Sequence, residues 1–205
     1  MCVVKPDLLT ETTLDSQSLL RGNFLDVRRD TVRLPDGSHS TREYIVHPGA
    51  VMVIALLEDG DVVLERQYRY PVGQVMVEFP AGKRDAGESA FACAQRELRE
   101  ETGYSASQWA RAGVIHPVIS YSTECIEIWF ARGLQAGVRQ LDAGEFLEVF
   151  TASPTDVLAW CADGSITDAK TVAGALWLQN VNSGAWTLDW QSVADLDASI
   201  LLSKS

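Results

Sequence analysis

The chain has 205 residues, and 46% of them are hydrophobic, which is enough for one domain with a sizeable core and an additional element. Its formal net charge of -11 excludes a general nucleic-acid surface, which needs clustered cations, and disfavours docking on anionic lipid. The charge does not exclude a small phosphorylated ligand, because a few local cations or carboxylate-bound metal ions can bind one.

The cysteine pattern and the apolar runs indicate the compartment. The four cysteines include no CxxC pair, so we interpret them as reduced thiols of a cytoplasmic protein. No segment approaches the ~20 apolar residues of a membrane span, and the N-terminal residues hold no apolar run of the length of a signal peptide. The cysteines are Cys2, Cys93, Cys125 and Cys161.

The first half of the chain reads as strands. Residues 1–20 show no clear period. The runs 24–34 and 39–47 flank Pro35-Asp36-Gly37, a sequence typical of a hairpin turn. A nearly continuous apolar run then predicts a strand buried on both faces, and two further strands follow. These three predicted strands cover residues 50–57, 62–70 and 75–79.

The period changes to that of a helix over Ser89 to Thr102, with Ser89 as a plausible N-cap and Gly103 as the residue after the last turn. Three more strands and two more helices follow, and the last twenty or so residues give no functional indication. Strands followed by a helix, strands and helices predict an α/β fold, with a mixed sheet between helices. The strands are expected at 114–119, 124–131 and 146–151, and the helices at 154–162 and 167–179.

Three acids lie close together near the end of the first predicted helix. Glu97 and Glu101 are four residues apart, and Glu100 is three after Glu97, so their carboxylates share one side of the helix. Like charges at this spacing repel, and the C-terminal turn is the wrong end of the helix dipole for acids. Divalent cations would offset this charge, and Mg²⁺ prefers oxygen ligands. Arg96, four residues before Glu100, is placed to orient one carboxylate.

The stretch from Gly82 to Tyr104 resembles the Nudix box, the signature of Nudix hydrolases. The matching positions are Gly82, Glu88, Arg96, Glu97, Glu100, Glu101 and Gly103, with Leu98 as the aliphatic position and Tyr104 as a slight departure. The resemblance extends over about residues 21–180 to the ADP-sugar (ADP-ribose-type) pyrophosphatase branch. The segments that carry it are 42–44, 47–50, 65–73, 78–82 and 167–171.

The resemblance implies roles for individual residues. Glu97, Glu100 and Glu101, with the main-chain carbonyl of Ala81, would hold the metal ions, which we expect to be Mg²⁺ with Mn²⁺ as the alternative. Glu145 would activate or position the attacking water, with Glu148 and Glu124 as the next candidates, while Glu100 and Arg96 would complete the catalytic set. The expected substrate-binding residues are Arg69 at the diphosphate, Arg42 and Phe24 near the base, and Glu78.

The expected fold is a Nudix α/β/α sandwich with a mixed sheet over residues 46–205, preceded by an antiparallel β-arm over residues 1–45. The related branch uses this arm to embrace a second subunit, so we expect a homodimer with the arm on the nucleobase side. Ile119 stands where many ADP-ribose enzymes have a proline, and this departure bears on the choice of sugar.

The expected reaction is hydrolysis of the diphosphate bond of an ADP-sugar such as ADP-ribose, which releases AMP and a sugar phosphate. A GDP-sugar, a dinucleotide cofactor or a dinucleoside polyphosphate are alternative substrates within the family. A ligand sensor with the Nudix fold but without turnover is the alternative outside enzyme function, although a sensor needs no full set of metal ligands.

Overall fold

The computed structural model describes residues 7–203, and the side chains up to residue 198. The chain divides into two compact units, each described by itself below. The N-terminal unit comprises the residues up to His47 together with Val118–Glu124, and the main unit comprises Pro48–Pro117 and the chain from Cys125 onward. Cys2 lies outside the described residues, and the three described cysteines are free thiols, as predicted.

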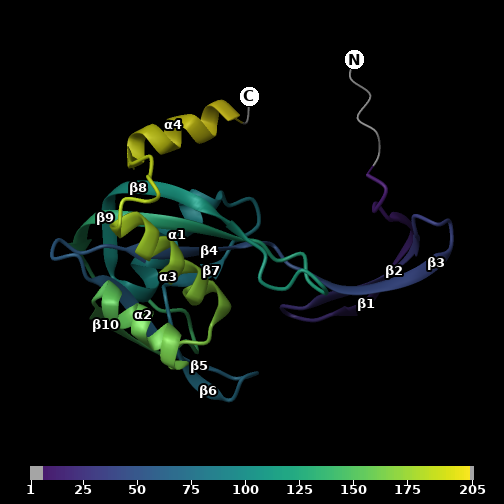
Figure 1. Cartoon of the computed structure of the whole chain (residues 1–205), viewed down its shortest axis with the longest axis horizontal. Helices are drawn as coiled ribbons and strands as arrows, with labels where there is room; N and C mark the ends of the chain where they lie inside the picture. Colours follow the sequence, from purple (N-terminus) through teal and green to yellow (C-terminus); the bar gives the residue numbers. More distant parts are fainter. Residues whose placement is uncertain (1–6, 204–205) are drawn as a thin grey trace. The chain divides into compact units, whose positions relative to one another are not determined.

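The N-terminal unit is built on a three-stranded antiparallel sheet in the order β1-β2-β3 (Figure 1). The strands are β1 (Thr12–Arg21), β2 (Asp26–Arg33) and β3 (His39–Val46). The predicted hairpin is confirmed, and its turn closes with a hydrogen bond of 2.9 Å from Gly37 N to Leu34 O.

Residues 12–21, which show no clear period in the sequence, form strand β1, and this strand pairs with β2 along its length. Every residue of β1 is exposed, so its side chains show no alternation between a buried and an open face. Backbone hydrogen bonds to β2 hold it, and these leave no trace in the pattern of residue types.

The main unit contains two sheets (Figure 1). A five-stranded sheet has the order β11-β8-β9-β4-β7, and it is mixed because β4 and β9 run parallel. A three-stranded antiparallel sheet has the order β10-β5-β6. The elements are β4 (Ala50–Ala55), β5 (Val62–Arg69), β6 (Gln74–Glu78), β7 (Ala81–Lys83), α1 (Ala90–Thr102), β8 (Tyr104–Ile115), β9 (Ile126–Ala136), β10 (Leu147–Ala152), α2 (Pro154–Asp163), α3 (Ala169–Asn182), β11 (Gln191–Ser192) and α4 (Val193–Ser203).

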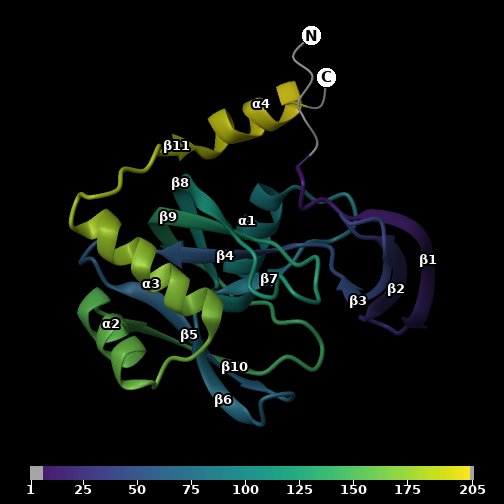
Figure 2. The same ribbon diagram turned by 45° about the vertical axis from the view of Figure 1, so that its right-hand side comes forward.

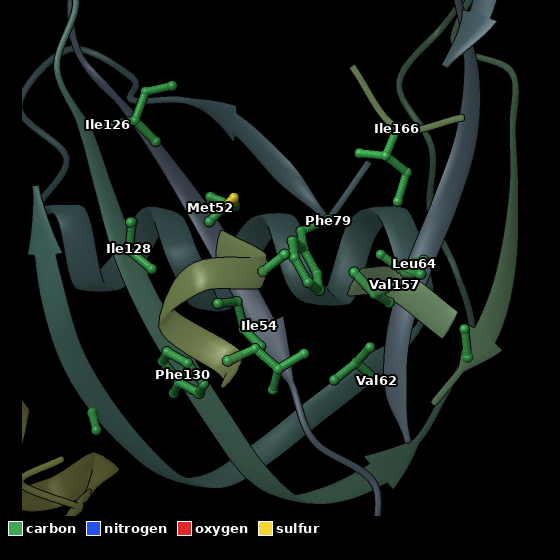
Figure 3. Close-up of a cluster of buried hydrophobic side chains, with 14 of the residues drawn as sticks. Met52, Ile54, Val62, Leu64, Phe79, Ile126, Ile128, Phe130, Val157 and Ile166 are labelled. Carbon is green, nitrogen blue, oxygen red and sulfur yellow. The ribbon is translucent and has the colours of Figure 1, made fainter. Parts of the chain in front are cut away.

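Strand β4 separates two hydrophobic clusters, as its unbroken apolar sequence predicts. Met52 and Ile54 pack in the cluster that receives side chains of α2 and α3, including Val157 (Figure 3). Val51 and Val53, on the opposite face, pack in the cluster that contains the apolar side of α1. Figures 1 and 2 show α2 and α3 side by side. The main unit is therefore an α/β/α sandwich, as expected from the sequence.

The local sequence accounts for both ends of α1. Ser89 has an extended backbone, and its side chain accepts a hydrogen bond from Ala92 N, which satisfies one free donor of the first turn. Gly103 ends the helix in the left-handed region at φ 79°, where a side chain would be strained. Phe91 and Leu98 are buried on the core side, and each contributes roughly 2 kcal/mol of hydrophobic stabilisation. The predicted helix is confirmed.

The strand predicted at 114–119 was wrong beyond Ile115, where β8 ends. Pro117 has no N–H to continue a ladder, and the chain turns after it. The apolar pair Val118-Ile119 favours a strand in the sequence, but Ile119 is exposed in the structure. The backbone of this segment instead pairs with β3, since Ile45 N donates to Tyr121 O at 2.9 Å.

The C-terminal residues, which gave no indication in the sequence, extend the five-stranded sheet. Strand β11 pairs with the edge strand β8, and Leu196 of α4 is buried in the cluster on the α1 side. The guanidinium of Arg132 lies 4.1 Å from the ring centre of Trp190. This tail thereby covers an edge that would otherwise expose unpaired backbone groups. No helix in the described part of the chain has the length and apolar character needed to span a bilayer.

Candidate active site

Three acids, Glu88 before α1 and two on the helix itself, contact one arginine of α1. Arg96 donates to Glu88 at 2.9 Å, to Glu97 at 2.8 Å and to Glu100 at 3.1 Å. Its guanidinium also reaches the backbone oxygen of Lys83 at 3.0 Å. The three acidic neighbours raise the pKa of Arg96, so the guanidinium stays charged. Arg96 therefore holds Glu100 and Glu97 in fixed orientations toward the start of the box.

Strand β7 lies against the two buried acids of the helix. Ala81 N donates to Glu101 Oε2 at 2.9 Å. A Cβ at Gly82 would overlap the carboxylate of Glu97, so only glycine permits this close approach of strand and helix. The backbone of Ala81 and the carboxylates of Glu97 and Glu101 are thus brought together by one short strand.

Burial sets the electrostatics of these acids. Burial raises the pKa of Glu97 to about 7, despite the guanidinium of Arg96. Burial also raises the pKa of Glu101 well above its usual value, and the negative charges of Glu65, Glu97 and Glu145 add to this effect. Burying several carboxylates close to one another costs free energy, unless a cation offsets their charge.

The donor set fits a hard divalent cation. Carboxylate and main-chain carbonyl oxygens are the ligands that Mg²⁺ and Mn²⁺ prefer. In the described part of the chain no three His, Cys, Asp or Glu side chains already converge on one point as ligands. Glu97 and Glu100 bond Arg96 instead, so a cation would compete with the guanidinium for their oxygens.

A second charged group lies on the three-stranded sheet. Arg69 of β5 donates to both oxygens of Glu78 on β6, at 2.6 and 2.9 Å. Lys170 of α3 bonds the same carboxylate, and also Asp168 at 2.9 Å. Glu78 is almost fully buried; burial acts to raise its pKa, but the bonds from Arg69 and Lys170 lower it overall. Glu78 therefore fixes the guanidinium of Arg69, which remains partly exposed.

Glu145 is connected to this sheet through Gln67 of β5, whose Nε2 donates to Glu145 Oε1 at 3.3 Å. Its second oxygen accepts from Asp142 N at 3.4 Å. The charge of Glu145 acts on both Glu97 and Glu101 and raises their pKa values. The structure thus brings Glu145 near the acids of α1.

The other two candidates for the base lie elsewhere. Glu148 alternates with the buried Leu147 on β10, is exposed, and bonds Arg66 at 2.8 Å. Glu124 belongs to the N-terminal unit, where its carboxylate is 3.8 Å from His47 Nε2.

Glu65 of β5 is a buried acid that the sequence reasoning assigned no role. Burial, with the neighbouring charge of Glu78, raises its pKa to about 8. Glu65 directly follows the apolar run Val62-Val63-Leu64. A charged residue that continues a buried strand is unusual, and this sequence feature could have identified Glu65 as a candidate. Lys170 lies in the segment 167–171, and the sequence likewise assigned it no role of its own.

The candidate base-binding residues belong to the N-terminal unit. Arg42 donates to both oxygens of Glu11, at 3.0 and 2.5 Å. The ring of Phe24 packs edge-on against His47, with ring centres 5.8 Å apart, and about half of its side chain is exposed. Both side chains are therefore accessible on the surface of this unit.

Comparison with known proteins places both parts of the chain. The Nudix domain model matches residues 46–173, and the model for the nucleoside diphosphate sugar hydrolase N-terminal domain matches residues 11–45. The chain is 34% identical over 173 residues to the ADP-ribose pyrophosphatase of Bacillus subtilis (strain 168). The matched region covers 83% of this chain and 94% of that protein.

A second relative is the methanol dehydrogenase activator of Bacillus methanolicus, which is 35% identical over 176 residues, or 84% of this chain and 94% of that protein. Among solved structures, that of an ADP compounds hydrolase superposes with a TM-score of 0.78 at 22% identity, covering 88% of this chain and 98% of the other. This structural similarity establishes the fold.

Proposed function

The chain belongs to the Nudix hydrolase family, and we propose that it hydrolyses the diphosphate bond of an ADP-sugar such as ADP-ribose, releasing AMP and a sugar phosphate. The observation that carries the proposal is the burial of Glu97 and Glu101 against β7, a group of carboxylates whose charge calls for a cation. The match of residues 11–45 to an N-terminal domain of nucleoside diphosphate sugar hydrolases supports the substrate class.

Nudix hydrolases use divalent cations. We propose Mg²⁺ for this chain, with Mn²⁺ as a substitute, held by Glu97, Glu100, Glu101 and the main-chain carbonyl of Ala81. When bound, such cations lower the pKa of water and polarise the phosphoryl oxygens. Arg96 positions Glu100 for this role, since the two side chains already share a hydrogen bond of 3.1 Å.

The remaining steps belong to side chains of this chain. Glu145 accepts the proton of the attacking water as general base, because it is a loop carboxylate near the acids of α1. Arg69 binds the diphosphate oxygens, and Glu78 sets the direction of its guanidinium through two hydrogen bonds. Holding both reacting groups in place lowers the entropic part of the barrier.

The N-terminal arm, residues 1–45, would serve the base and the assembly. Phe24 offers a half-exposed aromatic face for stacking, and Arg42, on β3 of the same unit, offers guanidinium donors. Strand β1 is exposed along its whole length and carries Leu14 and Leu20, which a second copy of the chain would cover. We therefore propose a homodimer with a two-fold axis. The free thiols favour a reducing compartment, the cytoplasm.

The test is kcat/KM for ADP-ribose, ADP-glucose, GDP-mannose, NADH and dGTP at one Mg²⁺ concentration. We expect the two ADP-sugars to be the best substrates, and dGTP to be poor because it lacks the second group whose binding energy positions the scissile bond. A preference for GDP-mannose or NADH would reassign the substrate within the family. Tight binding without Mg²⁺-dependent release of AMP would indicate a sensor.

A further inference from the structure

The alternation of β5 determines which way Glu65 faces. Val62 and Leu64 pack in the cluster with α2 and α3, whereas Val63 packs in the cluster with α1. Successive side chains of a strand point to opposite faces. Glu65, two residues after Val63, therefore points to the α1 face, as do Gln67 and Arg69.

Glu65 is fully buried, with 0% exposure, and neither of its carboxylate oxygens has a hydrogen-bond partner among the described residues. This is unusual, because buried carboxylates are normally bonded or paired. Its direct partner in the register of β5 and β6 is Glu78, which by contrast is bonded by both Arg69 and Lys170. The two nearby cations are thus already engaged by the neighbouring acid.

Acidic side chains act on Glu65 alongside the cations Lys170 and Arg69, which lower its pKa. Besides Glu78, the carboxylate of Glu145 acts on it, and Glu65 in turn is the strongest charged neighbour of Glu101 on α1. Both unbonded oxygens therefore lie close to acids that the proposed function assigns to cation binding and catalysis. A leucine would fill a purely structural position on this strand at no electrostatic cost.

We propose that Glu65 supplies a further carboxylate to the divalent-cation site, from the face of β5 that is turned toward α1. The site then takes carboxylates from both elements: Glu97, Glu100 and Glu101 from the helix, and Glu65 from the strand. This inference rests on the proposed cation-dependent function, and it adds a ligand that the Nudix box does not contain. The cation that it fits is a hard one such as Mg²⁺ or Mn²⁺, because all donors are oxygens.

The test is cation binding, measured without substrate. Mn²⁺ and Mg²⁺ are titrated into the wild type, Glu65→Gln and Glu58→Gln by calorimetry, and free Mn²⁺ is followed by electron paramagnetic resonance. Glu58→Gln is the matched control, because it removes the same charge from the exposed turn before β5. We expect Glu65→Gln to lose one bound ion or to bind at least about tenfold more weakly, and Glu58→Gln to match the wild type. An unchanged isotherm for Glu65→Gln would overturn the proposal.

Folding is monitored in EDTA by near-ultraviolet circular dichroism and Tm, with Glu65→Leu as a second variant. Both variants should keep the wild-type spectrum and an equal or higher Tm, because each removes an unbonded buried carboxylate, and the rise in Tm on adding Mg²⁺ should shrink. Loss of the folded spectrum in both variants would show that Glu65 stabilises the cation-free fold, which contradicts the proposal.

A failure of this inference is distinguishable from a failure of the proposed function. If Glu101→Gln loses the cation and Glu65→Gln retains it, Glu65 is no ligand, but the function stands. If cation binding depends on Glu65 and no nucleoside diphosphate derivative is hydrolysed, the ligand assignment stands and the function falls.

Discussion

Arg69 and Glu78 form a two-bond ion pair across the adjacent strands β5 and β6, with distances of 2.6 and 2.9 Å. The carboxylate is 3% exposed, whereas the guanidinium is 38% exposed. One end of the pair is therefore anchored in the protein while the other end can still meet a ligand. This arrangement suits a cation that must bind a diphosphate in a fixed direction.

Glu78→Gln should destabilise the protein by about 3 kcal/mol, because it leaves Lys170 buried without its main counter-charge. Unfolding in urea, monitored by tryptophan fluorescence, measures the change. Glu43→Gln is the control, since it breaks the exposed pair with Arg29 and should cost less than about 1 kcal/mol. Equal effects of the two substitutions would show that burial of the Glu78 pair does not matter.

Glu101→Gln should lower kcat by orders of magnitude while leaving the fold intact. The substitution removes one negative charge from the buried group at nearly constant volume, so the cation-free protein should be as stable as the wild type or more stable. Initial rates at saturating Mg²⁺ and Tm in EDTA provide the two measurements. Turnover near that of the wild type would remove Glu101 from the cation ligands.

Glu145→Gln should lower kcat with little change in KM, as expected for a base that acts on water and does not bind the substrate. Glu148→Gln is the comparison. Glu148 lies on β10, just after the loop that holds Glu145, but it is exposed and bonds Arg66. If Glu145→Gln keeps a normal kcat and Glu148→Gln does not, the base has been assigned to the wrong residue.

The pair of Glu88 with Arg96 predicts a specific loss of stability in acid. The hydrogen bond from Arg96 lowers the pKa of Glu88 from its usual 4.5 to about 2. Its stabilising contribution is therefore complete above pH 4.5 and disappears as the pH falls toward 2. At neutral pH the free energy of unfolding of the wild type should exceed that of Glu88→Gln by on the order of 3 kcal/mol, less what solvent screening removes. This difference should vanish near pH 2. Urea unfolding at several pH values tests this, and a constant difference would contradict it.

The proposed dimer predicts an oligomeric state. Light scattering on the wild type at micromolar concentration should give twice the mass of the 22.5 kDa chain. Replacing the exposed Leu14 and Leu20 of β1 with aspartate should shift the mass toward one chain, because each places a charge in the expected interface. Gln17→Asp, also exposed on β1, is the control for added charge. A wild-type monomer would end the proposal.

Local signals determined the helix of the box. Ser89 and Gly103 mark the two ends of a segment with helical periodicity. The spacing of Glu97 and Glu101 alone predicts that their carboxylates lie on one side of the helix. Such features depend on residues within one or two turns of each other. For the same reason the hairpin at Gly37 was predicted correctly.

Tertiary structure decided the partners of the buried charges. Lys170 reaches Glu78 across 92 positions of sequence, and Glu65 lies opposite Glu78 only because of the register of β5 and β6. Strand β1 was missed because it is held by backbone pairing, and its residue types carry no period. Strand pairing and burial bring distant parts of a chain together and so determine which charged side chains are in contact. Local sequence patterns do not contain this information, because they cover only neighbouring residues.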